Sequence, residues 1–198
     1  MALTKVQAGG VNLGDNFAFT GTVTGAGGMT KLATVSSTSS VSSVEISTDY
    51  SAHINFRLIL NIVGDNSSTS NGILRWKRSG QSSFDTGAIY GAQGSLLDAD
   101  NSHLNENATA NHLYFVDSQS PNRGYQVDMW LGGLGSTSAG NAMSCLTTMT
   151  GLQASVASFA MGGSYDNSTN AKEKVTDLQL AFSNGNISEL NYTLYGMN

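Results

Sequence analysis

The sequence is poor in charged residues and in cysteine, and each shortage excludes a class of protein. Charged residues make up 12% of the 198 positions, about half of the ~25% that is usual in soluble domains. The 9 lysines and arginines are scattered and the net charge is −5. We expect no nucleic-acid partner, because such a partner requires a basic face. The single cysteine, Cys145, excludes an intramolecular disulfide and a zinc site built from cysteines.

Long apolar runs are also missing. No stretch approaches the ~20 residues that a membrane helix needs, and no apolar segment of the signal-peptide type follows Met1. We therefore expect a chain that is made in a cytoplasm and does not insert into a membrane. If it works outside a cell, it leaves by a route other than a Sec-type signal.

Small polar residues take the place of the missing charges. The chain has 23 glycines and 1 proline, and 39% of its residues are hydrophobic. That apolar share is enough for a core and argues against disorder. A surface of hydroxyl and amide groups with few charges suits a protein that meets other protein or sugar surfaces.

The closing segment, residues 175–195, has the clearest strand pattern. Leu178, Leu180 and Phe182 alternate with polar residues, and a second alternating run covers residues 190–195. Between the two runs, Asn184-Gly185 favours the positive φ values of a tight hairpin turn. The pattern predicts a hairpin that closes a β-sheet.

Other segments with strand character precede this one. They cover residues 54–62, 73–78, 84–90, 113–116, 125–131, 142–149 and 155–161, whereas 96–111 is predicted to be a loop with a short helical turn. No helical period extends over ~10 residues. About eight strands without alternating helices predict an all-β protein, a jelly-roll-like β-sandwich. The sequence leaves the strand order open.

The first 31 residues differ from the rest. They are rich in glycine and threonine, carry isolated apolar residues, and alone bury too little to fold stably. We expect an extended N-terminal arm over residues 1–35, a boundary between Gly28 and Ser43, and the sandwich over 43–198. The alternative is a flexible tail. The candidate anchoring residues of the arm are Val6, Val11, Leu13, Phe17 and Phe19.

Residues with catalytic or metal-binding chemistry do not form a recognisable site. Asp98-Ala99-Asp100-Asn101-Ser102-His103 is the densest group of potential ligands, but it lacks the glycine and glutamate of an EF-hand loop. No Gly-x-Ser-x-Gly elbow occurs among the strands. The three histidines, His53, His103 and His112, are expected to be structural or surface groups. We therefore predict no enzyme, no cofactor and no metal.

Aromatic residues are better candidates for a binding surface. Trp130 is out of phase with the apolar set Tyr125, Val127, Met129 and Leu131, so it is expected on the opposite face of its strand. An exposed Trp130 or Trp76 could stack on a sugar ring or anchor an interface. Asp128 is the one acid beside such a platform. The alternative is that the core or a neighbouring subunit covers both tryptophans.

Several of these segments resemble a β-domain that is common in virion proteins of tailed bacteriophages. Ser47-Thr48-Asp49-Tyr50 leads into the strand at 54–62 as a similar turn does in that family. Ile73-Leu74-Arg75-Trp76 is similar to its next strand, and residues 175–196 are similar to its C-terminal end. The opening, Met1-Ala2-Leu3-Thr4-Lys5-Val6, resembles those of phage fibre and spike chains. The match departs at His53, where the family often has tyrosine, and at Ser188-Glu189-Leu190, which lacks a glycine.

The resemblance implies a virion structural protein, commonly a homotrimer, that contacts other virion proteins of the tail or the major capsid. Within that class we expect a short tail fibre-like protein whose sandwich meets the host surface, which includes glycans. The first alternative is a capsid decoration (cement) protein that stabilises the phage head. An alternative of another class is a free lectin-like, carbohydrate-binding module. The matching motifs are turns and core strands, so they bear on fold more than on role.

Overall fold

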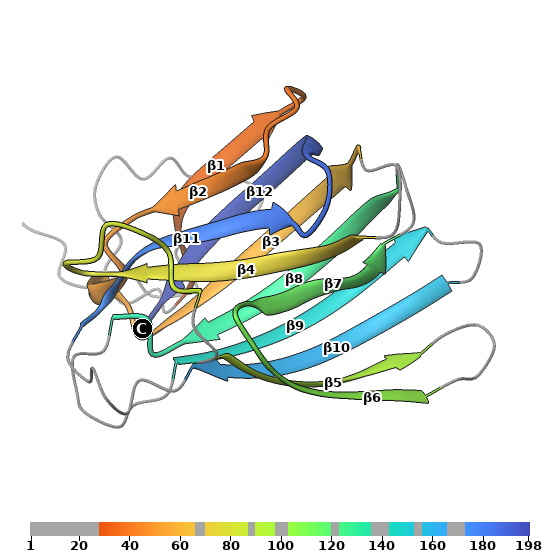
Figure 1. Cartoon of the computed structure of the whole chain (residues 1–198). Helices are drawn as coiled ribbons and strands as arrows, with labels where there is room; N and C mark the ends of the chain where they lie inside the picture. Colours follow the sequence, from red (N-terminus) through yellow and green to blue (C-terminus); the bar gives the residue numbers. More distant parts are fainter. Residues whose placement is uncertain are drawn as a thin grey trace, which may run out of the picture.

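The computed structural model describes residues 28–65, 70–86, 90–97, 103–119, 123–135, 143–152, 156–165 and 173–198 (Figure 1). These residues form strands and one short 3₁₀ helix, η2 (Tyr50–Ala52). The strands are β1 (Thr30–Ser37), β2 (Ser43–Ser47), β3 (Asn55–Gly64), β4 (Ser70–Arg78), β5 (Tyr90–Leu97), β6 (His103–Ala110), β7 (Leu113–Gln119), β8 (Gly124–Gly132), β9 (Met143–Leu152), β10 (Val156–Tyr165), β11 (Val175–Phe182) and β12 (Ile187–Met197).

The strands make two antiparallel sheets that face each other. Within the part of the chain that the structure describes, the larger sheet has 8 strands in the order β1-β12-β3-β8-β9-β10-β5-β6, and the smaller has 4 in the order β2-β11-β4-β7. Figure 1 shows the smaller sheet lying across one face of the larger one. The all-β class and the two-layer arrangement that the sequence predicts are confirmed.

The core lies between the sheets because the inward positions of the strands are apolar. In β3, Phe56, Leu58, Leu60 and Ile62 are all buried, while the residues between them are exposed or half-buried. β8 repeats this pattern with the apolar set predicted from the sequence. Each side chain of this size contributes roughly 1.5–3 kcal/mol when fully buried, so the alternation in β3 and β8 is a main source of stability.

The predicted closing hairpin is wrong in its pairing. The turn after β11 exists, and Gly185 has the positive φ of 82° that a tight turn needs. However, β11 pairs with β2 and β4, while β12 pairs with β1 and β3 in the other sheet. The chain crosses between layers at this turn, because the apolar faces of both strands are buried when they oppose each other across the core.

Strand β1 lies inside the range, from Gly28 to Ser43, in which the sequence predicts the domain boundary. Residues 30–37 form β1, which pairs along its length with β12, so residues 30–35 belong to the larger sheet and not to an arm. Leu32 and Ala33 pack against the core. The five candidate anchoring residues, from Val6 to Phe19, lie outside the described residues.

The predictions at 84–90 and 96–111 are wrong as well. Residues 84–86 are not in a strand, whereas β5 begins at Tyr90 and pairs with β6, which occupies much of the predicted loop. Among the described strands, β6 is the last of its sheet and pairs with β5 alone. Its sequence, His-Leu-Asn-Glu-Asn-Ala-Thr-Ala, has little apolar alternation. Pairing with β5 holds this segment as a strand, and a local pattern does not reveal such pairing.

Candidate binding face on the larger sheet

The outer face of the larger sheet carries the side chains that alternate with the core residues of β3, β8 and β12. The strand register places Tyr195, Arg57, Trp130 and Leu146 side by side in one row across β12, β3, β8 and β9. A sheet face with this many apolar and aromatic groups is a candidate binding surface. We refer to these four residues as the aromatic row.

Trp130 is the centre of this row and lies where the sequence predicts it. Its side chain is 42% exposed, and its neighbour Leu146 is 52% exposed. Both are large apolar side chains in contact with solvent, and single exposed residues of this kind are common. Their position side by side is more informative, because adjacent exposed groups form a continuous apolar surface.

The charges beside Trp130 neutralise each other. Arg57 donates hydrogen bonds from Nε and Nη2 to the two carboxylate oxygens of Asp128, at 3.0 and 2.7 Å. These bonds raise the pKa of the guanidinium. The same guanidinium lies 5.0 Å from the centre of the Trp130 ring, which is cation–π distance. Asp128 is therefore the partner of an arginine next to the indole.

A pocket of about 410 Å³ lies beside the indole. We call it the indole pocket; it is lined by Asn55, Trp130, Leu131, Gly132, Ser144, Cys145, Leu146, Met197 and Asn198. Its apolar wall comes from Trp130, Leu146 and Met197, and its polar groups include two asparagine amides and one serine hydroxyl. No charged side chain lines it.

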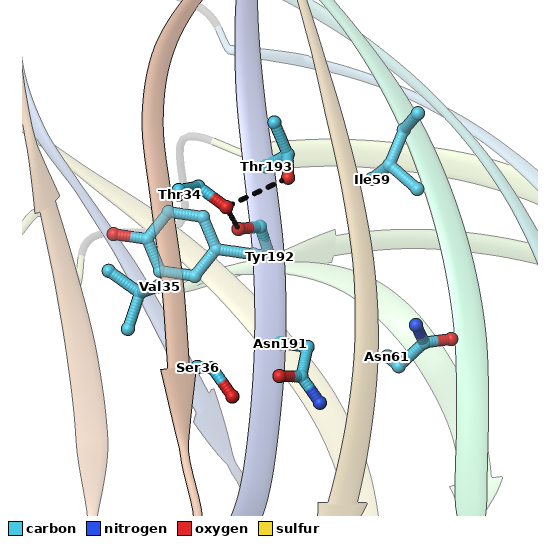
Figure 2. Close-up of a pocket in the computed structure, with 8 residues that line it drawn as sticks. All are labelled: Thr34, Val35, Ser36, Ile59, Asn61, Asn191, Tyr192 and Thr193. Carbon is cyan, nitrogen blue, oxygen red and sulfur yellow. Dashed lines mark hydrogen bonds between the residues drawn. The ribbon is translucent and has the colours of Figure 1, made fainter.

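A second, smaller depression lies nearer the β1 edge of the same sheet (Figure 2). We call this depression, of about 260 Å³, the amide depression; it is lined by Thr34, Val35, Ser36, Ile59, Asn61, Asn191, Tyr192 and Thr193. Asn61 and Asn191 are opposite each other in the register of β3 and β12. The Thr34 hydroxyl donates to the carbonyl of Tyr192 at 3.1 Å and lies 3.1 Å from the Thr193 hydroxyl. Thr193 is therefore the donor between the two threonines.

Trp76 is not a surface residue, which corrects the prediction made from sequence. It is completely buried between the sheets, with its ring 5.5 Å from that of Tyr90. The Trp76 backbone N–H donates to the Tyr90 hydroxyl at 3.2 Å, and that hydroxyl donates to the backbone carbonyl of Asp85 at 3.2 Å. In β4, polar and apolar residues occur on both faces, so the local pattern does not orient Trp76.

A buried ion pair explains how a charged residue of β4 can point inward. Arg78 and Asp85 have side chains only 7% and 10% exposed, with Nε and Oδ2 at 3.0 Å. The amide of Gln81 donates to the same carboxylate at 2.6 Å, and Glu173 lies 3.5 Å from the guanidinium. Burial of an arginine requires such compensation.

The histidines and acidic residues weighed as metal or catalytic candidates occupy separate places. His53 Nδ1 lies 2.9 Å from Asn198 Oδ1, His112 packs edge-on against Tyr114 at 4.6 Å, and His103 begins β6. Residues 98–102 lie outside the described part of the chain. Within the described residues, no three His, Cys, Asp or Glu side chains lie close enough together to hold a metal ion.

Sequence reasoning found Trp130 and Asp128 but missed the residues that surround them. Arg57, Asn55, Ser144 and Leu146 come from β3 and β9, and their arrangement depends on how these strands pair with β8. The sequence pattern that could have located some of them is the alternation of apolar and polar residues along a strand. In β3, positions 55 and 57 alternate with the apolar core positions, so they were predictable as outward residues, although their neighbours were not.

Comparisons with family models, with curated proteins and with solved structures found no match to this chain. The described residues include no helix that is long and apolar enough to cross a membrane.

Proposed function

We propose that the chain is a structural protein of a bacteriophage virion, a short tail fibre-like protein whose β-sandwich is displayed for contact with the host surface. The sequence resemblance supports this class. The observation that carries the display role is the aromatic row: an exposed indole and leucine stand beside a neutralised Arg57–Asp128 pair on a broad sheet face. Such a surface contacts protein or sugar without requiring a charged partner.

We further propose that the sandwich is a jelly roll and that it assembles as a homotrimer. When the pairs β5–β6 and β9–β10 are left out, the order β1-β12-β3-β8 faces the order β2-β11-β4-β7, and consecutive strands alternate between the sheets except at β4 and β7, which are neighbours in the smaller sheet. This winding supports the jelly-roll assignment. The family resemblance supports the trimer, and the glycine- and threonine-rich composition of the N-terminal segment supports an arm. The part of the predicted arm that precedes the described residues, 1–27, would join chains or anchor them to other virion proteins.

A capsid decoration protein is the second candidate, because a compact sandwich with a preceding segment also suits attachment to a capsid lattice. In that role the aromatic row would contact the major capsid protein. A free lectin-like module is the candidate from another class. It requires a sugar site but no virion, and it leaves residues 1–27 without a role.

The first experiment locates the chain on particles. Gold-labelled antibodies raised against the purified protein are expected to label the tail tip or fibres of virions that carry this sequence. Label on the head would favour the decoration protein, and particles without label would refute a virion role.

The second experiment measures mass in solution by light scattering, for the full chain and for a version that lacks residues 1–27. We expect a trimer that dissociates on truncation. If both versions were monomers, the proposed assembly through the N-terminal segment would be wrong.

A further inference from the structure

We propose that the indole pocket binds a neutral sugar residue. This inference rests on the host-contact part of the proposed function and deepens it by naming the class of ligand. A sugar ring has an apolar face of C–H groups and a rim of hydroxyls. A site for it needs an apolar platform next to a few uncharged groups that both donate and accept hydrogen bonds.

The platform is the Trp130 indole. Arg57 lies over the ring at 5.0 Å, and its bonds to Asp128 hold it there. This contact favours one orientation of the indole before a ligand arrives, which lowers the entropic cost of binding. Leu146 and Met197 extend the apolar wall beside the ring.

The polar groups converge because one lining residue lacks a side chain. A Cβ added at Gly132 would lie 2.8 Å from the Ser144 hydroxyl and 3.3 Å from Asn55 Oδ1. Glycine at this position leaves open a space that both the amide oxygen of Asn55 and the hydroxyl of Ser144 border. Asn198 Oδ1 is occupied by His53 Nδ1 at 2.9 Å, so the NH₂ group of Asn198 remains as a donor for a ligand.

The charge and size of the pocket define the ligand further. None of the lining side chains is charged, and the nearby Arg57 and Asp128 satisfy each other, so an uncharged sugar fits better than an acidic one. The volume of about 410 Å³ lies at the small end of the ~300–1,000 Å³ range of ligand pockets.

The amide depression provides an internal comparison on the same face. It has asparagine amides and threonine hydroxyls but no tryptophan. A sugar that requires the indole platform should not bind in the amide depression. Asn191→Ala is therefore a matched control for Asn55→Ala, because each removes one exposed asparagine amide from the larger sheet.

The test is a titration of the full-length, ¹⁵N-labelled protein with the methyl glycosides of D-glucose, D-galactose and N-acetyl-D-glucosamine. The two indole N–H signals are followed by NMR. We expect at least one glycoside to shift the Trp130 signal in a saturable way, with a dissociation constant on the order of 1 mM, while the signal of buried Trp76 stays in place.

Asn55→Ala and Trp130→Ala should each weaken binding about ten-fold or more. Because Trp130→Ala removes the indole signal, its binding is followed by the backbone amide signals around the pocket. Asn191→Ala should leave it unchanged.

Two results would overturn the proposal. One is no saturable shift with any of the three glycosides up to about 100 mM. The other is binding that Asn55→Ala and Trp130→Ala leave intact, or that Asn191→Ala weakens equally. The antibody labelling of particles is scored separately, so a failure of sugar binding and a failure of the virion role remain distinguishable.

Discussion

Replacement of Asp85 by asparagine is expected to destabilise the fold far more than the same replacement at Asp128. Both carboxylates pair with an arginine, Arg78 in one case and Arg57 in the other. The side chains of the first pair are 7% and 10% exposed, whereas those of the second are each 28% exposed. The two variants make the same chemical change in two solvent environments.

The magnitude follows from burial. Loss of one partner of a buried ion pair costs roughly 3–5 kcal/mol, because the other charge is left uncompensated in a poorly solvated place. Glu173 lies 3.5 Å from Arg78 and compensates part of that charge. We therefore expect about 3 kcal/mol for Asp85→Asn, and about 0–1 kcal/mol for Asp128→Asn because water solvates the surface pair.

Urea unfolding followed by circular dichroism measures the difference. With a slope of about 2 kcal/mol per molar urea, Asp85→Asn should lower the midpoint by about 1.5 M and Asp128→Asn by less than about 0.5 M. A double variant, Arg78→Met with Asp85→Asn, should recover part of the loss, since it removes the uncompensated charge. Equal shifts for the two single variants would refute the burial argument.

Three further predictions concern single groups. Acrylamide should quench the fluorescence of Trp130 and leave that of Trp76 largely unquenched, since their exposures are 42% and 0%; equal quenching of both tryptophans would contradict these positions. Burial raises the pKa of Cys145 to about 11, so the thiol should resist Ellman's reagent at about pH 8 until the protein unfolds, and rapid reaction of the native protein would contradict this. Hydrogen bonds from the Asn186 backbone and then the Ser40 hydroxyl lower the pKa of Asp65 below 3.8. The stability that this carboxylate contributes is present above its unfolded pKa and is lost as the pH falls through the folded one. Asp65→Asn should therefore flatten the fall of Tm below about pH 4, and an unchanged acid profile would refute it.

The two tryptophans show how far sequence reasoning reaches towards the candidate site. Trp130 was placed outward correctly because its strand alternates strictly, with Tyr125, Val127, Met129 and Leu131 on the inner face. Trp76 was misjudged because β4 has Arg75 and Lys77 on one face and Arg78 on the other. The inward arginine is tolerated only because Asp85, in the segment that follows β4, pairs with it.

The sequence by itself determined the all-β class, the inner and outer faces of β3 and β8, and the turn at Gly185. These features depend on the period of two residues along a strand and on the φ preference of glycine, so they can be seen within a few residues. The tertiary structure alone decided which strands pair. In the tertiary structure β1 pairs with β12, β11 and β12 lie in different sheets, and β6 forms an edge of the larger sheet. The indole pocket depends on the same pairing. Asn55, Trp130, Ser144 and Asn198 are distant in the chain, and they meet because β3 and β8 are neighbours and β9 and β12 flank them.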